Sequence, residues 1–154
     1  MSIKHVLQRR HVPFEVLSHP EAFDAQHLAQ ALQTPGRAVA KTVLLRADHG
    51  GHYIVAVLPA THRIDFEALS ASLGGTALEL ATELEIGERC PDCEFGVLPP
   101  FGSHYSLQTI VDRSLTADES IAFESDSHTE AIRMKYADYC EFERPLVADF
   151  ARHL

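Results

Sequence analysis

The residues that most directly suggest chemistry are Cys90 and Cys93, a Cys-x-x-Cys pair in the stretch CPDCEFGVLPPFG. Thioredoxin-like redox sites use this spacing at a helix N-terminus, but residues 94–96 do not begin a periodic helix. A structural zinc site would need two more ligands, of which Cys140 could supply one. We therefore expect both cysteines to be reduced and metal-free, and we keep a thiol or metal function as a minor alternative.

The rest of this stretch is expected to be a stiff, irregular loop. Pro91, Pro99 and Pro100 exclude a helix, and each would remove a hydrogen-bond donor from a central strand. Gly96 and Gly102 allow positive φ or the close approach of another molecule to the backbone. The apolar side chains between the two glycines are Val97, Leu98 and Phe101. Such a loop is typical of a pocket wall, although a buried turn that binds nothing is an equal alternative.

A lysine and a serine–histidine pair are further candidates. Lys41 shares a strand face with Val43 and Leu45, so its amine must reach water, an anion or a ligand, unless it snorkels past the strand edge. Ser127 and His128 precede an alternating run. They do not form a catalytic dyad by adjacency, because neighbouring strand residues point to opposite faces. Their hydroxyl, imidazole and backbone groups could still line a site at the strand end.

The elements that would position these residues can be predicted from periodicity. Residues 38–46 and 52–58 predict a hairpin with apolar side chains on both faces, as in a sheet covered by helices or a closed, curved sheet. Further strands are expected at 14–18, 77–80, 106–112, 121–123 and 129–136. Helices are expected at 2–11, 24–33, 65–73, 82–88 and 137–143. Because the strands come in runs without regular βαβ alternation, we predict a single α+β domain over residues 1–154, with a curved, mostly antiparallel, barrel-like mixed sheet surrounded by helices.

Composition limits the partners that the chain can have. The chain of 154 residues carries 22 acidic and 13 basic side chains, and this net charge of -9 argues against DNA and against tight, unaided binding to any nucleic-acid backbone. Apolar runs stay well short of the ~18 residues of a membrane span. The charged N-terminus lacks the apolar core of a signal peptide, and three cysteines cannot all pair, so we expect a cytoplasmic protein.

Four short motifs occur together in one order: Lys41-Thr42, Pro59-Ala60, residues 96–102 and residues 127–130. This combination resembles the YbaK/prolyl-tRNA-synthetase-associated domain family over about residues 12–150. The resemblance implies a curved mixed sheet surrounded by helices. It also implies an aminoacyl-tRNA deacylase that hydrolyses the ester of mischarged tRNA in trans, without a cofactor. The substrate would be the 3′ end of an aminoacyl-tRNA, with a synthetase or an elongation factor as a candidate partner.

The resemblance also assigns roles to residues of this chain. The family's lysine falls on Lys41 and its GxxxP loop on Gly96 and Pro100, which we predict as catalytic. The predicted substrate-binding residues are Thr42, Val97, Leu98, Phe101, Gly102, Ser127 and His128. Backbone N–H groups of residues 96–98 would stabilise the oxyanion, and Lys41 would hold the terminal phosphate or the ribose. Asp126 takes the place where the family usually has glycine, which adds negative charge near a site for an anionic substrate.

Two other functional classes stay open. The first is a non-catalytic module on the same fold that binds aminoacyl-adenosine or tRNA without turnover. The second is a thiol protein that uses Cys90 and Cys93. Within the deacylase hypothesis, the family implies small amino acids such as alanine, serine or cysteine. The acidic net charge suggests that a partner supplies most of the affinity for tRNA.

Overall fold

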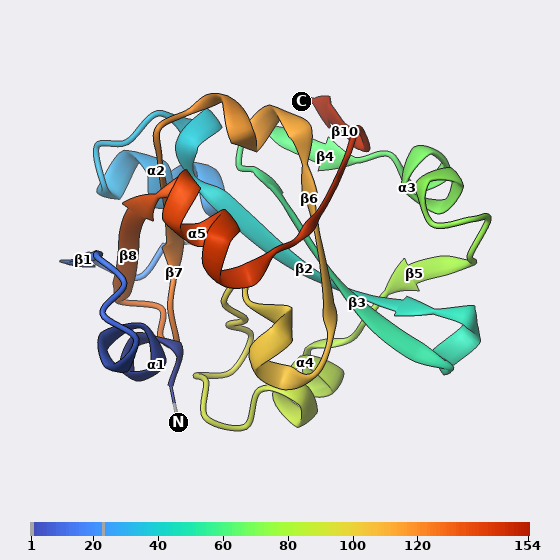
Figure 1. Cartoon of the computed structure of the whole chain (residues 1–154), viewed down its shortest axis with the longest axis horizontal. Coiled ribbons are helices and arrows are strands. Elements are labelled where there is room, and N and C mark those ends of the chain that lie inside the picture. Colours follow the sequence, from blue (N-terminus) through green and yellow to red (C-terminus); the bar gives the residue numbers. More distant parts are fainter. Residues whose placement is uncertain (1, 23) are drawn as a thin grey trace.

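Short helices and three β-sheets make up the described part of this computed structural model, residues 2–22 and 24–154 (Figure 1). The α-helices are α1 (Ile3–Arg9), α2 (Ala25–Ala31), α3 (Phe66–Ser72), α4 (Glu83–Arg89) and α5 (Tyr136–Glu143). The strands are β1 (Glu15–Ser18), β2 (Ala40–Ala47), β3 (His52–Pro59), β4 (His62–Ile64), β5 (Leu78–Leu80), β6 (Gln108–Asp112), β7 (Ser120–Glu124), β8 (Glu130–Lys135), β9 (Leu146–Ala148) and β10 (Ala151–His153). The predicted α+β class is confirmed.

The largest sheet has the strand order β5-β2-β3-β6-β9. In it, β2 is antiparallel to β3 and β5, whereas β6 is parallel to β3 and β9. A second sheet, β1-β8-β7, is antiparallel throughout, and a single bridge from Val39 to Ala122 joins it to the start of β2. The remaining pair, β4 and β10, is also antiparallel. The sheet system is therefore mixed and mostly antiparallel, as predicted, and the pairings of residues 2–22 and 24–154 do not form a closed ring.

The hairpin of β2 and β3 crosses the middle of the molecule, where both of its faces are covered (Figure 1). Val55 and Val57 belong to a core that also contains Phe101, Phe123 and Tyr139. Ile54, Ala56 and Leu58 face the other way, into a core with Leu69 of α3 and Phe150. The sequence prediction that both faces are buried is confirmed, because alternate residues of β3 enter two different cores.

Side-chain caps begin three of the helices where the sequence predicts them. Asp24 caps α2, Asp65 caps α3, and Thr82 caps α4 in a capping box with Glu85. Each cap satisfies an N–H group that the helix itself leaves unpaired, a contribution of about 1 kcal/mol. Caps matter here because helices of seven residues are marginal on their own. Two of them, α2 and α4, flank the pocket described below.

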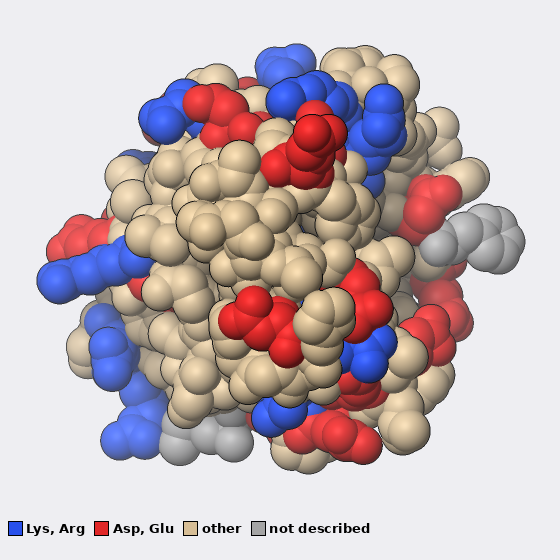
Figure 2. Space-filling view, turned by 90° about the vertical axis from the view of Figure 1, so that its right-hand side faces the viewer, with Lys and Arg blue, Asp and Glu red and all other residues tan. Residues whose placement is uncertain are grey.

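The surface charges are mixed on the face shown in Figure 2, where acidic side chains lie among the basic ones and much of the centre is uncharged. This pattern differs from the continuous basic stripe that marks an autonomous nucleic-acid-binding surface. Within residues 2–22 and 24–154, no helix combines the length and the apolar character needed to cross a bilayer.

Candidate active site

A pocket of about 450 Å³ opens between α2, the first half of β2 and the loop that follows α4. It brings together six of the residues that the sequence singled out: Lys41, Thr42, Gly96, Val97, Leu98 and His128. The rest of its wall comes from the α2 region, from other residues of β2 and of the loop, from Glu83 of α4 and from Glu124 of β7. Segments that are far apart in the sequence thus meet at one cavity of a size that suits a small ligand.

A second hollow of the same volume is lined by other residues of α2 and by the segment that follows it. Its wall consists of Gln26, His27, Ala29, Gln30, Gln33, Thr34, Gly36 and Thr61. It contains neither a carboxylate nor an amine, and none of the predicted site residues. We therefore take the pocket at Lys41 as the candidate active site.

Lys41 lies opposite Leu58 in the hairpin, and its side chain is partly buried. Its amine has no hydrogen bond or ion pair with any residue in the described ranges 2–22 and 24–154. Burial lowers the pKa of Lys41, and the negative charge of Asp24 opposes this shift in part. A partly desolvated amine that lacks a protein partner is well suited to bind an anion from a ligand.

The edge of β2 is open where it borders the pocket. Strand β5 pairs only with residues 45–47 of β2, and the bridge to the second sheet lies at Val39. The N–H of Ala81 donates to the carbonyl of Leu44, which shows that the backbone groups of Leu44 point to the β5 side of β2. Backbone groups two residues apart in a strand point to the same side, so those of Thr42 face this edge as well. Strand β5 does not extend far enough to pair with them. Thr42 lines the pocket and offers it a main-chain donor and a main-chain acceptor at this edge.

The loop after α4 has a fixed conformation at Gly96, where φ is +84°. Glycine adopts this left-handed backbone without strain, whereas other residues pay about 1–2 kcal/mol. The N–H of Val97 donates to the carbonyl of Glu94 at 3.0 Å, so it is already used. The N–H groups of Gly96 and Leu98 have no partner within residues 2–22 and 24–154. The predicted set of oxyanion donors is therefore corrected to these two.

The loop is held by the turn that contains His128. The backbone N–H of His128 donates to the Glu94 carboxylate at 2.7 Å, and its ring Nε2–H donates to the Phe95 carbonyl at 2.8 Å. In return, the N–H of Glu94 donates to the carbonyl of Asp126 at 2.8 Å. A Cβ at Gly96 would lie 3.9 Å from the His128 ring. The glycine loop and the serine–histidine turn, which are separate motifs in the sequence, form one structural unit.

Glu124 lines the same pocket next to His128, with its carboxylate 3.5 Å from the imidazole Nδ1. Burial raises the pKa of Glu124, although the neighbouring His128 offsets part of the effect. Burial alone would lower the pKa of His128, but the hydrogen bond to Phe95 and the charges of Glu124 and Glu94 outweigh it, so the net pKa is raised. Sequence analysis missed Glu124. Its place at the end of a predicted strand, beside the Ser127-His128 turn, was the available signal.

Three of the predicted site residues lie outside the pocket and behind the loop. Pro100, Phe101 and Gly102 are buried, and none of them lines the cavity. The carbonyl of Pro100 accepts a hydrogen bond of 2.6 Å from the Tyr139 hydroxyl, and the N–H of Gly102 donates to Thr109 Oγ1. Phe101 packs edge to face against Phe123, Tyr139 and Phe142. The structure therefore places these three residues behind the pocket lining, where they support the loop, and does not bring them to the cavity.

A buried carboxylate on α5 completes this support. Glu143 accepts hydrogen bonds from the Thr109 hydroxyl and from both the N–H and the hydroxyl of Ser103. A Cβ at Gly102 would lie 2.6 Å from Thr109 Oγ1, so only glycine fits between these groups. Gly102 is therefore a packing requirement of the loop's far end.

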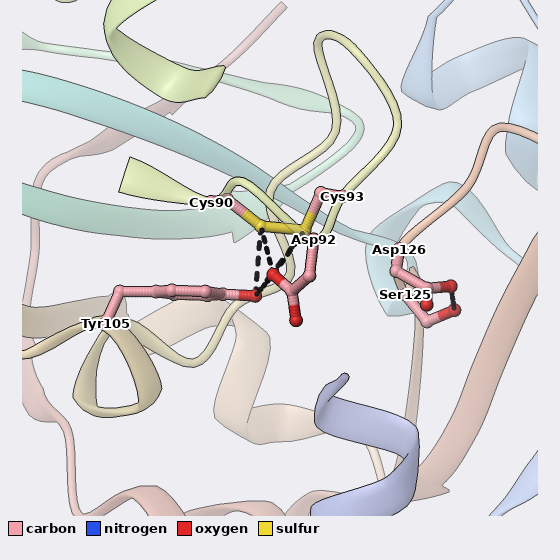
Figure 3. Close-up of a disulfide and its surroundings, with 6 residues drawn as sticks. All are labelled: Cys90, Asp92, Cys93, Tyr105, Ser125 and Asp126. Atoms are coloured by element: carbon pink, nitrogen blue, oxygen red, sulfur yellow. Dashed lines mark hydrogen bonds between the residues drawn. A yellow bond between two sulfur atoms is a disulfide. The ribbon is translucent and has the colours of Figure 1, made fainter. Parts of the chain in front are cut away.

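The turn at residues 125–128 differs from expectation in two respects. Ser127 does not line the pocket, and its hydroxyl accepts from the N–H groups of Thr129 and Glu130, so it orders the turn. The structure therefore places Ser127 in the turn and not in the lining of the pocket. Asp126 is not among the residues with positive φ, so it replaces the family's glycine without left-handed strain. Its carboxylate accepts from the Ser125 hydroxyl and does not line the pocket (Figure 3).

The structure pairs Cys90 and Cys93 in a disulfide, which corrects the prediction that both are reduced (Figure 3). Cys90 follows the last turn of α4, and the N–H of Cys93 bonds back to its carbonyl, which brings the two Cα atoms to 5.5 Å. The Tyr105 hydroxyl lies 3.0 Å from Cys90 Sγ and 3.4 Å from an oxygen of Asp92. After reduction of the disulfide, the two thiolates and Asp92 would give a metal three ligands, one fewer than structural zinc uses.

These features define the class of protein: an α+β fold that presents a lysine, a glycine-edged loop and a histidine turn to one small-ligand pocket. The family model described as the aminoacyl-tRNA editing domain matches residues 19–142. The chain belongs to this family, and the resemblance seen in the sequence is confirmed.

Individual relatives agree with this membership. The chain is 26% identical over 150 residues to the multifunctional Ser/Thr-tRNA deacylase ProXp-y of Escherichia coli strain K12, an alignment that covers 96% of this chain and 89% of the relative. It superposes on the crystal structure of a putative trans-editing enzyme for prolyl tRNA synthetase with a TM-score of 0.81 and 20% identity, covering 97% and 94% of the two chains. The crystal structure of a hypothetical protein gives a TM-score of 0.85 at 18% identity, with 97% and 99% covered. Both structures share the fold.

Proposed function

We propose that this protein is an aminoacyl-tRNA deacylase, which hydrolyses the ester of mischarged tRNA in trans. The observation that carries the proposal is the convergence of the unpaired Lys41 amine and the Gly96 loop on one pocket of about 450 Å³. A single ester-bearing nucleotide can contact both. Membership of the editing-domain family and the likeness to a Ser/Thr-tRNA deacylase support the same activity.

Ester hydrolysis passes through a tetrahedral intermediate whose oxygen becomes negatively charged. The free N–H groups of Gly96 and Leu98 are the donors for this oxyanion, and one such donor typically supplies ~2.7–4 kcal/mol of transition-state stabilisation. Lys41 binds the terminal phosphate or the ribose and thereby fixes the ester against the loop. The open edge at Thr42 adds polar contacts to the same nucleotide.

His128 acts in this mechanism by holding the loop. Its Nε2–H is bound to the Phe95 carbonyl and its Nδ1 faces Glu124, so both ring nitrogens have protein partners. A general base needs a free nitrogen within reach of the attacking water. The attacking water is therefore activated by the substrate, for which the hydroxyl next to the ester on the terminal ribose is available, and no side-chain nucleophile is needed.

The amino acid removed is a small one, and alanine, serine, threonine and cysteine form the panel to test. The ProXp-y relative acts on Ser/Thr-tRNA according to its name. The pocket walls contributed by Leu28, Val97 and Leu98 are apolar, and such walls discriminate by only ~1–3 kcal/mol per methylene. The net charge of -9 and the mixed surface of Figure 2 fit a cytoplasmic protein that gains tRNA affinity from a synthetase or an elongation factor.

Single-turnover hydrolysis of a panel of mischarged tRNAs tests the proposal. We expect at least one small aminoacyl-tRNA to be deacylated well above its spontaneous rate. Binding of aminoacyl-tRNA without any acceleration of hydrolysis would instead identify a non-catalytic module. Tight binding of whole, uncharged tRNA at physiological salt without any partner would contradict the proposed dependence on a second protein.

A further inference from the structure

The pocket is more acidic than the binding of a nucleotide requires. Three carboxylates line it, those of Asp24, Glu83 and Glu124, whereas Lys41 is the lysine in its wall. A pocket that served only to bind phosphate would gain from the opposite balance, because negatively charged groups repel a phosphate. The excess of negative charge therefore points to a ligand that carries a cation as well as an anion.

The three carboxylates differ in how many hydrogen bonds and charge interactions they already make with the protein. Asp24 is the cap of α2 and accepts from both the backbone N–H and the ring of His27. Glu83 is exposed in the first turn of α4, where the helix dipole accounts for an acidic residue. Glu124 is partly buried; among residues 2–22 and 24–154 its Oε2 lies 3.5 Å from the ring of His128, and the imidazole of His19 is a second electrostatic neighbour.

Glu124 therefore has acceptor capacity left within the pocket. An ionised carboxylate offers about four acceptor positions on two oxygens, so it can keep His128 as a neighbour and still accept a second cationic donor. Among the described residues, neither oxygen of Glu124 is a buried atom that lacks a hydrogen-bond partner, and Glu124 lines the pocket. Lys41 is not that donor, since the two side chains line the same pocket without forming an ion pair within residues 2–22 and 24–154.

We propose that Glu124 binds the α-ammonium group of the aminoacyl ester and makes the pocket selective for esters with a free amine. The inference rests on the proposed deacylase function. In an aminoacyl ester the ammonium is attached to the carbon next to the reacting carbonyl. A carboxylate beside His128, whose ring borders Gly96, is therefore on the correct side of the loop to hold the ammonium while the carbonyl faces the N–H donors.

The test compares two esters of the same tRNA in single-turnover kinetics. One is the aminoacyl-tRNA that the protein hydrolyses fastest, and the other is its deaminated form, in which an uncharged α-hydroxyl replaces the ammonium. The preference is the ratio of their kcat/KM values, and comparing it between protein variants cancels the intrinsic reactivity of the esters. We expect Glu124→Gln to reduce this preference about 10- to 100-fold, the range of one charge-assisted hydrogen bond, by slowing mainly the amino ester.

Two further variants provide the controls. Glu83→Gln removes the same charge from the exposed part of the wall and should keep the preference for the amino ester. Glu124→Asp keeps the charge on a shorter side chain and should retain more of the preference than Glu124→Gln. Far-ultraviolet circular dichroism and thermal melting of each variant confirm that the comparison is between folded proteins.

The outcomes separate this inference from the proposed function. If Glu124→Gln slows both esters equally, Glu124 acts by orienting His128 and the ammonium assignment is overturned. An unchanged preference in a fully active Glu124→Gln protein overturns it as well. In both cases the deacylase function stands. A wild-type protein that hydrolyses neither ester, nor any other of the panel, would overturn the function and the inference together.

Discussion

Lys41 is the residue whose removal most directly tests the site. Its amine has no protein partner in the described ranges, so Lys41→Ala leaves no buried charge behind. Strand β2 keeps its pairing with β3, which depends on the backbone. Substitutions without an orphaned partner usually change stability by no more than about 0.5 kcal/mol, so we expect the variant to melt close to the wild-type temperature.

The effect on rate should be much larger than the effect on stability. A hydrogen bond to a charged group is worth about 1.5–3 kcal/mol, which corresponds to roughly 10- to 150-fold in an equilibrium or rate constant. Loss of the anchor also lets the ester shift relative to Gly96, and a misplacement of about 1 Å can cost ~100-fold. We therefore expect Lys41→Ala to lower kcat/KM for a mischarged tRNA by about 100-fold.

Two further measurements show what Lys41 binds. If its partner is a single-strand phosphate, the log–log slope of tRNA affinity against salt should shrink by ~0.7 in Lys41→Ala. Lys41→Arg should restore binding better than rate, because a planar guanidinium keeps the charge but changes the geometry. Lys135→Ala is the matched control, since Lys135 is exposed at the end of β8 and does not line the pocket. A Lys41→Ala protein that melts normally and hydrolyses at the wild-type rate would remove Lys41 from the site.

Three more predictions follow from the loop and its supports. Gly96→Ala should lower the melting temperature by about 2–8 °C and the single-turnover rate at least ~10-fold. The reason is that a φ of +84° costs a non-glycine residue about 1–2 kcal/mol. An unaffected rate would exclude the loop from catalysis. Tyr139→Phe leaves the Pro100 carbonyl without its donor, and urea unfolding should report a loss of about 1–3 kcal/mol. Thiol titration should find one free thiol before reduction and three after it. The Cys90→Ser, Cys93→Ser double variant should keep its deacylase activity, and loss of activity would assign the thiols a function.

Local patterns explain which elements the sequence predicted. The hairpin and the caps at Asp24, Asp65 and Thr82 depend on residues close together in the chain, so periodicity and capping chemistry were sufficient. Strands β4, β9 and β10 were not predicted. Each has three residues, too few for an alternation to be seen, and each pairs with a partner far away in the sequence. Their existence depends on tertiary packing.

For a related reason, only some of the predicted site residues come together at the pocket. Lys41 and Gly96 were predicted from features of their own, an amine on an apolar strand and a glycine in a proline-rich loop. Phe101 and Gly102 were included because they share that loop, but the chain turns into the core after Leu98. Glu124 was missed because its contact with the pocket depends on the fold, and the local signal, its place between a predicted strand and the Ser127-His128 turn, did not single it out.

The loop is fixed from two sides, and this arrangement supports the proposed mechanism, in which no side-chain nucleophile is used. On the pocket side, His128 holds Phe95 and Glu94; on the core side, the Tyr139 hydroxyl holds the carbonyl of Pro100. The residues between these anchors include Gly96 and Leu98, whose N–H groups have no partner among residues 2–22 and 24–154. Donors that are already oriented cost no reorganisation when charge develops on the ester, so rigidity at this loop can replace side-chain chemistry. By the same reasoning, substitutions at the buried anchor should lower kcat more than they raise KM, although the anchor lies outside the pocket.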